Sequence, residues 1–359
     1  MLLHREPRSL LVTGAAGFIG SAFVRWLLDH EEWSGHVVSL DALTYAGHLS
    51  KLASILDDPR HTFVHGSILD GALLDQLQEN WSFDTILHCA AETHVDRSIQ
   101  GPQLFTLTNV LGTQEILEFV RRHPQIHHHQ VSTDEVFGAL GPTGLFDEKS
   151  PYAPNSPYAA SKAAADHLVA AYANTYGLST TISYASNNFG PYQHPEKIIP
   201  LMLCNLRHRQ PLPLYGSGQQ VRDWLYVDDH AEGLWSLLRH APAGRRYCLG
   251  GEHECSNLSL VQNLIQLFVH HAEATGCSPP SADELHSLIQ HVADRPGHDF
   301  RYAMDTTRAR EELGWVPRTP FHAALSSTVQ WHLTQANPPA KGVSFEWTSR
   351  LEQQCAFRL

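Results

Sequence analysis

The sequence predicts an α/β fold, a doubly wound parallel sheet with a smaller C-terminal lobe. Short apolar runs alternate with longer amphipathic runs over the first half of the chain, which is the pattern of βαβ units. A glycine-rich turn joins the first apolar run to the first amphipathic one. After about residue 189 proline and glycine become frequent, which indicates ligand-facing loops or a small second lobe.

We expect strands where short runs of apolar and β-branched residues end at polar residues, and helices where longer runs carry one apolar face. The Ala-rich run that stops at Gly177 is a strong helix candidate. The expected strands are SLLVTG (9–14), HVVSLD (36–41), HTFVHG (61–66), DTILHCAA (84–91), HHHQVST (127–133) and STTISYASN (179–187). The expected helices cover residues 18–30, 70–80, 105–123 and 156–177.

A chain of 359 residues is long enough for two lobes. The runs VDDHAEGLWSLLRH and RRYCLGG resemble a return to the first domain. We therefore expect a Rossmann-type domain from residues 1–188, with returns at about 223–250 and 306–335. The substrate-binding lobe is expected from residues 189–222, residues 251–305 and the C-terminal tail.

The net charge, the apolar runs and the cysteines of the chain limit its partners and its location. A formal net charge of -12 without a run of Lys or Arg argues against nucleic acid as the main partner. The chain has no apolar run of about 18 residues and no signal-peptide core, so we expect no spanning helix. Six scattered cysteines without a CxxC pair favour reduced thiols and the cytoplasm. The histidines at 127–129 lack a nearby carboxylate or cysteine ligand, so we expect no metal, and surface exposure is the default for histidine here.

The run TGAAGFIG places Gly14, Gly17 and Gly20 between the first strand and the first helix. Such glycines permit a tight turn and let a pyrophosphate approach the helix N-terminus. Asp41 follows at the end of the second strand, 21 residues after Gly20. A carboxylate there accepts hydrogen bonds from a ribose 2′-hydroxyl and repels a 2′-phosphate, which favours NAD over NADP. A simpler interpretation is a glycine-rich turn beside an ordinary surface aspartate.

Tyr158 and Lys162 are four residues apart on the Ala-rich helix and share one face. An ammonium beside a phenol stabilises the phenolate and lowers its pKa, which makes tyrosine a usable base. The spacing alone is common by chance.

The run STDEVFG places Asp134 and Glu135 directly after Ser132 and Thr133, where a buried strand ends. The simple interpretation is a solvated turn, since such residues are mostly exposed. In a dry site, two close carboxylates would separate in pKa, leaving one protonated acid and one ionised base.

Together these motifs resemble the extended short-chain dehydrogenase/reductase superfamily. Within it the chain resembles the nucleotide-sugar 4,6-dehydratases, most closely the branch that acts on dTDP-glucose; related epimerases usually lack the Asp-Glu pair after Ser-Thr. The resemblance extends from about residue 10 to 315. It is carried by TGAAGFIGS, DALTYAGHLSKL, HCAAETHVDRSI, STDEVFG, SPYAASKAAADH, SNNFGPYQHPEKIIPL, PLPLYGSGQQVRDWLYVDDH, RPGHDFRYAMD and ELGW.

The resemblance implies a lyase that uses NAD to oxidise carbon 4 of the sugar, remove water across carbons 5 and 6, and reduce carbon 6. It assigns Tyr158 as the base for the carbon 4 hydroxyl, assisted by Lys162, with Thr133 hydrogen-bonded to the same oxygen. Asp134 would protonate the leaving carbon 6 hydroxyl. Glu135 would remove the carbon 5 proton.

The resemblance also implies the binding residues, a nucleotide-sugar substrate and a homodimer. Arg222 and Arg295 suit a diphosphate because a guanidinium offers a planar fork of donors. The other expected substrate residues are Thr93, Thr133, Asn187, Lys197, Pro213, Tyr215, Asn257 and His298. The expected NAD residues are Gly14, Gly17, Phe18, Ile19, Gly20, Asp41, Thr44, Ser67, Ile68, Ala90, Ala91, Thr108, Tyr158, Lys162 and Asn188.

Some positions depart from the family pattern. Ala42 stands where Lys is frequent, Ser67 where Asp is usual, Cys89 where Leu is usual, and Thr93 where Ser is usual. The altered cofactor contacts motivate a second hypothesis, a non-catalytic NAD-binding regulator. The same scaffold could also support a UDP-sugar 4,6- or 5,6-dehydratase, or a nucleotide-sugar 4-epimerase. The choice between thymine and uracil stays open at this point.

Overall fold

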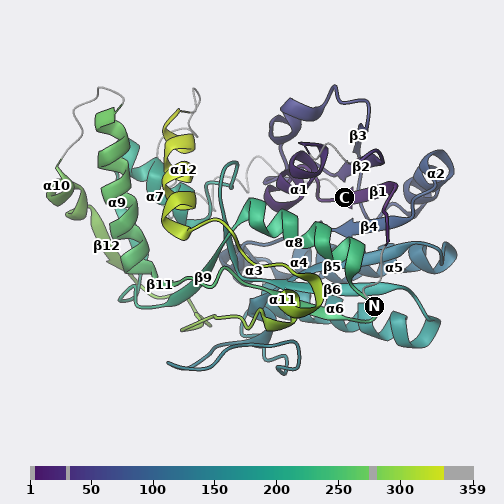
Figure 1. Cartoon of the computed structure of the whole chain (residues 1–359). Helices are drawn as coiled ribbons and strands as arrows, with labels where there is room; N and C mark the ends of the chain where they lie inside the picture. The colour runs from purple at the N-terminus through teal and green to yellow at the C-terminus, as the bar shows by residue number, and fades with distance from the viewer. Residues whose placement is uncertain (1–4, 30–32, 275–280, 335–359) are drawn as a thin grey trace. The chain divides into compact units, whose positions relative to one another are not determined.

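The structure is a computed structural model that describes residues 5–29, 33–274 and 281–334 (Figure 1). The chain forms two compact units, and each is described here by itself. The first unit comprises Met1–Asn188, Arg222–Glu254 and Asp299–Phe321. The second comprises Phe189–Val221, Cys255–His298 and the chain from His322 onward. The part of the expected C-terminal tail after residue 334 lies outside the described residues.

The first unit is built on a seven-stranded sheet in the order β10-β6-β5-β4-β1-β2-β3, in which every recorded strand pair is parallel (Figure 1). The strand order reverses between β1 and β4, as in a doubly wound sheet. This topology confirms the predicted α/β class. The strands are β1 (Ser9–Thr13), β2 (His36–Asp41), β3 (His61–His65), β4 (Thr85–His88), β5 (His127–Thr133), β6 (Thr180–Ala185) and β10 (Arg246–Leu249).

Helices cover both faces of this sheet because alternate strand residues point to opposite sides. Leu10 and Val12 of β1 join a core formed with α1 and α8. Leu11 joins a second core formed with α2, α5 and α6. The helices of this unit are α1 (Phe18–Asp29), α2 (Gly71–Trp81), α3 (Val95–Gln100), α4 (Pro102–Phe105), α5 (Gly112–Arg122), α6 (Pro157–Tyr176), α8 (Val227–His240) and α11 (Thr307–Leu313), with short helical turns η1 (Leu49–Ile55), η2 (Thr106–Leu111) and η3 (Asp134–Phe137).

The run from residue 105 to 123 is not the single α-helix that its pattern predicts. It comprises the end of α4, the wider π-helical turn η2 and then α5. Buried Asn109 sits in η2 and hydrogen-bonds away from its own helix, to the backbone of Glu92 and to Ser161. Such single π-turns are frequent near functional sites.

The three histidines at 127–129 are buried, so surface exposure was the wrong expectation for them. They lie in the central strand β5. His127 and His129 hydrogen-bond the Thr181 hydroxyl of neighbouring β6, at 3.0 and 2.8 Å. His128 points to the other face, 5.8 Å from the ring of His88. Serine and threonine hydroxyls on the neighbouring strand therefore allow imidazoles to occupy sheet positions that usually hold aliphatic residues.

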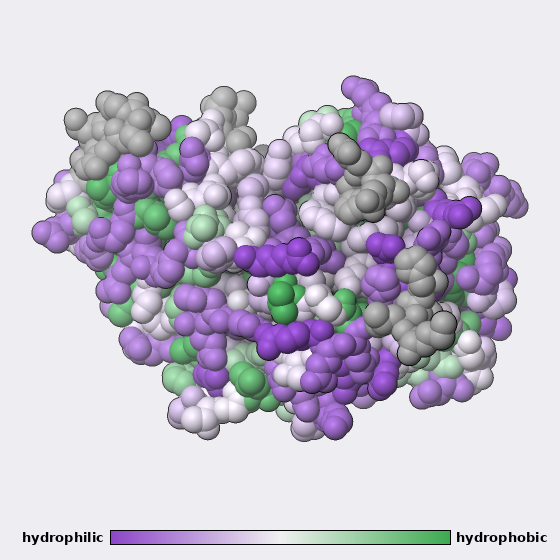
Figure 2. All heavy atoms as spheres, viewed as in Figure 1, coloured by the Kyte–Doolittle hydropathy of each residue, from purple (hydrophilic) through white to green (hydrophobic). Residues whose placement is uncertain are grey.

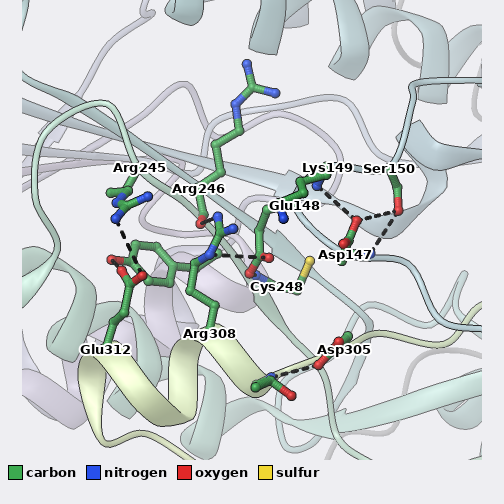
Figure 3. A network of polar contacts seen from close by, with 12 residues as sticks. Asp147, Glu148, Lys149, Ser150, Arg245, Arg246, Cys248, Asp305, Arg308 and Glu312 are labelled. Carbon is green, nitrogen blue, oxygen red and sulfur yellow. Dashed lines mark hydrogen bonds and ion pairs between the residues drawn. The ribbon is translucent and has the colours of Figure 1, made fainter.

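A polar network attaches the edge strand β10 to the rest of the first unit (Figure 3). The Cys248 amide donates to the Glu148 carboxylate at 3.0 Å, and Arg308 of α11 lies 3.6 Å from the same carboxylate. Burial raises the pKa of Glu148. At the other end of β10, Arg245 pairs with Glu312 at 3.7 Å. These contacts tie together segments that are distant in sequence.

The second unit contains helices and a two-stranded parallel sheet of β8 and β12. Its elements are α7 (Ile198–His208), β8 (Leu212–Tyr215), α9 (Asn257–Ala274), α10 (Ala282–His286), β12 (Ile289–Val292) and α12 (Phe321–Thr334). Three short strands, β7 (Asn187–Phe189), β9 (Val221–Tyr226) and β11 (Glu254–Ser256), form a further sheet in the order β11-β9-β7. The chain passes from one unit to the other at these strands.

Arg222 and residues 251–254 belong to the first unit, not to the second lobe as expected. Two longer segments also differ from the expected domain boundaries. Residues 299–305 belong to the first unit and residues 322–334 to the second, the reverse of the expectation. The assignment of residues 299–305 has a local reason. The amides of Leu140 and Phe146 donate to the carbonyls of Arg301 and Ala303, both at 2.9 Å, which fastens that segment to the first unit.

The face of the molecule in Figure 2 is mostly hydrophilic, with apolar residues scattered over it. Within the described ranges, none of the helices combines the length and the apolar character needed to cross a membrane.

Candidate functional site

The glycine-rich turn lies at the switch point of the sheet, against the end of β4. Gly14 has a φ of +67°, and a Cβ atom there would lie 2.7 Å from the backbone of Ala90. A Cβ atom on Gly20 would lie 2.4 Å from the carbonyl oxygen of Gly14. Only glycine fits these two positions without displacing backbone. The turn thereby places the N-terminus of α1 where parallel α/β sheets bind phosphate groups.

Asp41 ends β2 beside this turn. Its carboxylate accepts hydrogen bonds from the amides of Ala16, at 2.9 Å, and Leu43, at 2.7 Å. The Ala16 amide belongs to the glycine-rich turn, so the acid and the turn are held together at one edge of the sheet. This is the arrangement that a dinucleotide requires, with pyrophosphate on the helix end and a ribose hydroxyl on the carboxylate. The residues present therefore fit NAD.

Most of the other predicted NAD residues lie at or after the carboxyl ends of the strands of the first unit; Thr108 lies in η2, and Tyr158 and Lys162 lie on α6. Among them, the Ser67 hydroxyl accepts from the amide of Leu69 at 3.2 Å, and the Ala90 amide donates to Thr13 at 3.3 Å. The remaining ones are Phe18 and Ile19 in the first turn of α1, Thr44 after β2, Ile68 after β3, Ala91 after β4, and Asn188 in β7.

Tyr158 and Lys162 lie on α6 with both side chains buried. Lys162 donates from Nζ to the carbonyl oxygen of Val131 in β5 at 2.8 Å. Burial, and then the charge of Glu135, raise the pKa of Tyr158 well above its ordinary value, while a hydrogen bond with Thr133 opposes them. In the protein without NAD the phenol therefore keeps its proton, so its use as a base would require the positive charge of a bound nicotinamide ring in addition to that of Lys162. The sequence predicted that Lys162 would lower the pKa of Tyr158, but the net shift is upward.

Thr133, Asp134 and Glu135 form the junction between β5 and η3. The Thr133 hydroxyl accepts from the Glu135 amide at 3.3 Å and donates to Asp134 Oδ1 at 3.1 Å. Asp134 is only 2% exposed, so the interpretation of a solvated turn does not hold. Among the described residues, no hydrogen-bond partner reaches its Oδ2 atom.

The environment of Asp134 makes it a proton donor. Burial, and then the neighbouring Glu135, raise the pKa of Asp134 well above its ordinary value. A carboxyl group in such a site is protonated at neutral pH, and an uncharged Oδ2–H loses less by lacking a partner than an ionised oxygen would. Glu135, by contrast, is only partly buried. The pair thus has the asymmetry that acid and base roles require.

Two supporting residues escaped sequence reasoning. Asp166 is fully buried on α6 and accepts from Ser132 at 2.5 Å and from Tyr152 at 3.4 Å, while burial raises its pKa to about 6. Its spacing of four residues from Lys162 was the available signal. The side-chain oxygen of Asn109 accepts a hydrogen bond from the Glu92 amide at 2.8 Å, and its side-chain nitrogen donates to the Ser161 hydroxyl at 2.8 Å. Ser161 in turn donates to the carbonyl of Tyr158 at 2.7 Å. No local sequence pattern predicts that Asn109 is connected to Tyr158 in this way.

Four of the predicted substrate residues belong to the first unit: Thr93, Thr133, Asn187 and Arg222. Arg222 is 5% exposed and donates to the carbonyls of Asp299, at 3.0 Å, and Phe300, at 3.3 Å. Its guanidinium carbon lies 4.3 Å from the ring centre of Tyr302. The structure thus holds this guanidinium in one orientation, as a preorganised anion ligand requires.

The other six lie in the second unit: Lys197, Pro213, Tyr215, Asn257, Arg295 and His298. Three of them are brought together around Asp294. The carboxylate of Asp294 lies 2.6 Å from His298 Nδ1 and accepts from the Arg295 amide at 2.9 Å. The rings of Tyr215 and His298 meet edge to face at 5.8 Å. Lys197 precedes α7, Pro213 lies in β8 and Asn257 begins α9.

In the described part of the chain, no group of three or more His, Cys, Asp or Glu residues is placed to hold a metal ion.

Comparisons with known proteins show what the chain as a whole is similar to. The family model described as GDP-mannose 4,6 dehydratase matches residues 11–328. The dTDP-glucose 4,6-dehydratase of Xanthomonas campestris pv. campestris is 48% identical over 333 residues, covering 90% of this chain and 93% of the relative. That of Neisseria meningitidis serogroup B is 45% identical over 336 residues, covering 91% and 93%.

Solved structures extend the comparison. The dTDP-glucose 4,6-dehydratase of Streptomyces venezuelae with NAD and TYD bound has a TM-score of 0.83 and 45% identity, covering 90% of this chain and 96% of that one. The Bacillus anthracis enzyme in complex with NAD has a TM-score of 0.81 and 42% identity, covering 91% and 97%. A UDP-glucuronic acid 4-epimerase from Bacillus cereus is more distant, with a TM-score of 0.78 and 25% identity, covering 90% and 98%.

Proposed function

The chain belongs to the dTDP-glucose 4,6-dehydratases, a branch of the GDP-mannose 4,6 dehydratase family, and we infer that it is an NAD-dependent hydro-lyase. It converts dTDP-glucose to the nucleotide-linked 4-keto-6-deoxy sugar. The observation that carries this function is the enclosed Asp134 beside Glu135, next to Tyr158 and Lys162. An epimerase would need no such acid, so a 4-epimerase is not favoured, and neither is a UDP-sugar dehydratase.

The chemistry that bound NAD supplies is the oxidation of carbon 4 and the later reduction of carbon 6. We propose that the glycine-rich turn and Asp41 hold the cofactor. The other residues named above at the strand ends complete the site.

The protein's own residues move the protons in this proposal. Tyr158 accepts the proton of the carbon 4 hydroxyl, with Lys162 as the nearby positive charge and Thr133 hydrogen-bonded to the same oxygen. The ketone at carbon 4 acidifies the hydrogen on carbon 5, which Glu135 removes. Asp134 protonates the carbon 6 hydroxyl so that it leaves as water, and its enclosure keeps it protonated until then.

For the substrate, we propose that Arg222 and Arg295 bind the diphosphate and that Tyr215 and Asn257 flank the base. Thr93 contacts the sugar, and Asn187, Lys197, Pro213 and His298 complete the set. The support is chemical: guanidinium forks suit phosphate oxygens, and an aromatic ring suits a pyrimidine.

The test of the function is the mass of the product. Purified protein with NAD is expected to lower the mass of dTDP-glucose by one water molecule, and UDP-glucose should react far more slowly. Unchanged mass with an altered sugar spectrum would indicate epimerisation. No product from any nucleotide-sugar would contradict an enzymatic role.

We further propose a homodimer that forms through α4 and η2. Leu104, Leu107 and Leu111 are 43%, 44% and 47% exposed, and their spacing of three and four residues places them along one side. Changing Leu107 and Leu111 together to Glu is expected to yield monomers in size-exclusion chromatography with light scattering. Leu145→Glu, at a position 53% exposed in a loop, is the control that should stay dimeric. A double variant that remains a dimer would place the interface elsewhere.

We also propose a cytoplasmic location. Cys89 and Cys248 are thiols in the structure, and thiols persist in a reducing compartment. Fractionation of cells that produce the protein tests this location, and recovery in the periplasmic or secreted fraction would contradict it.

A further inference from the structure

Helix α6 carries three polar side chains at intervals of four residues: Tyr158, Lys162 and Asp166. This spacing places them on one face of the helix, and all three are buried. Tyr158 and Lys162 have roles in the proposed reaction. Asp166 lies one turn further along and is completely buried, although the reaction itself does not require a third polar group on this face.

Two hydrogen bonds join this face to the last part of β5. Lys162 donates from Nζ to the carbonyl of Val131 at 2.8 Å, and the Ser132 hydroxyl donates to Asp166 Oδ2 at 2.5 Å. Val131 and Ser132 directly precede the junction of β5 and η3, which carries the proposed acid and base. The proton chemistry on α6 and the proton chemistry after β5 are therefore held together at these two bonds.

A carboxylate is a costly side chain for this position if it serves only to hold Ser132. An asparagine would accept the same hydrogen bond through its amide oxygen, without the cost of burying a charge. Asp166 Oδ2 also accepts from Tyr152 at 3.4 Å, whereas no hydrogen-bond partner among the described residues reaches Oδ1. Burial raises the pKa of Asp166 to about 6, which still leaves the group ionised at neutral and alkaline pH. The negative charge therefore needs a reason of its own.

Asp166 faces positive charges and neutral phenols. Lys162 acts on it from the same helix and Arg246 from β10. The hydroxyls of Tyr152 and Tyr184 meet at 2.5 Å, and both phenols stay neutral because burial raises their pKa values. Of the two cations, Lys162 shares the buried face of α6 with Asp166, at the four-residue spacing at which opposite charges on a helix attract each other.

The charge of Lys162 depends on this neighbour. Burial lowers the pKa of Lys162, and the charge of Asp166 is the first influence that opposes this shift. The other titratable groups around the ammonium are neutral near pH 7, because burial lowers the pKa of His88 and His128 and raises the pKa of the Cys89 thiol to about 12. The catalytic phenol needs the nearby positive charges to release its proton, so loss of the ammonium charge would stop the oxidation step.

We propose that Asp166 is a positioning residue for both halves of the reaction. Through Ser132 it holds the start of the catalytic junction against α6, and as an ionised carboxylate it keeps Lys162 charged and so supports Tyr158 as the base. The inference rests on the proposed function. It adds a residue outside the acid, the base and the groups that bind substrate or cofactor.

The first experiment tests the charge. It measures the oxidation step as the loss of dTDP-glucose in a single turnover of the NAD-bound enzyme, by rapid quench and mass spectrometry, from neutral to alkaline pH. Asp166→Asn keeps the shape and the acceptor for Ser132, so only the alkaline limb, where Lys162 loses its proton, should move to lower pH, by about one unit or more. Asp147→Asn is the matched control, since that carboxylate accepts from Ser150 at 3.0 Å in a loop, and it should keep the wild-type limb.

The second experiment tests the hydrogen bond. Ser132→Ala keeps the carboxylate charge, so the oxidation step should keep the wild-type alkaline limb. Release of water should slow about tenfold or more, because the acid and the base are displaced, and the 4-keto sugar that retains its carbon 6 hydroxyl should accumulate. Ser132→Thr restores a hydroxyl and should recover most of the lost rate.

An unmoved alkaline limb in Asp166→Asn would overturn the proposal, and so would a rate that falls equally at every pH, because a merely structural residue behaves in that way. If circular dichroism shows that Asp166→Asn does not fold, the two Ser132 variants decide, and equal rates of water loss in both would overturn the proposal. Failure of the proposed function is distinguishable, because wild type would then form neither the 4-keto sugar nor the dehydrated product.

Discussion

Asp134→Asn is expected to slow the formation of dehydrated product by about 10²–10⁴-fold, the usual contribution of a positioned general acid. The amide has nearly the same shape but cannot deliver a proton to the carbon 6 hydroxyl. Oxidation at carbon 4 does not use this proton, so a 4-keto sugar that still contains its carbon 6 hydroxyl should accumulate. Rapid quench followed by mass spectrometry separates it from the dehydrated product.

Glu135→Gln should block the same reaction at a different atom. Product formed by wild type in heavy water is expected to carry deuterium at carbon 5, whereas the glutamine variant should neither exchange that position nor release water. Asp75→Asn, at an exposed carboxylate paired with Arg122 on the surface, is the control for Glu135→Gln.

For Asp134→Asn, product formation at the wild-type rate would refute the acid role assigned to Asp134, even if the overall function stands.

The parts of the site that sequence could predict are local. Thr133, Asp134 and Glu135 are consecutive, and they follow a short run that the alternation of strands and helices along the first half of the chain marks as a strand, so a polar turn at a strand end follows from the sequence. The glycine-rich turn is local in the same sense. Asp41 was identifiable because it also ends a strand, at the spacing that a βαβ unit imposes.

The parts that sequence could not predict depend on contacts between distant segments. Lys162 donates a hydrogen bond to the carbonyl of Val131, which is 31 residues away in the sequence. The hydrogen bond from Asn109 to Ser161 joins residues 52 positions apart. The pKa of Tyr158 shows the consequence. Spacing on one helix suggested that Lys162 would lower it, yet enclosure by other elements raises it. Likewise, the burial of His127 and His129 depends on Thr181, which only strand pairing brings near.

Acid should destabilise the first unit through the histidines of its sheet. The pKa of His128 is lowered to about 4, chiefly by burial, against an ordinary value of 6.5. Its surroundings are His88, Lys162 and Gln130. Between pH 6.5 and 4 the unfolded chain binds a proton at this residue that the folded protein does not, so the free energy of unfolding falls as pH decreases. At pH 5 this one residue is expected to cost roughly 2 kcal/mol relative to pH 7.5.

His128→Leu isolates this effect from the other titrating groups. Asp166 and Asp223, whose pKa values burial raises to about 6, act in the opposite direction and are present in both proteins. Urea unfolding at pH 7.5 and pH 5 should show that the variant loses roughly 2 kcal/mol less than wild type between the two conditions. His322→Leu, at an exposed position, should follow wild type. Equal losses in wild type and His128→Leu would mean that burial does not lower the pKa of His128 in the folded protein, and would contradict the prediction.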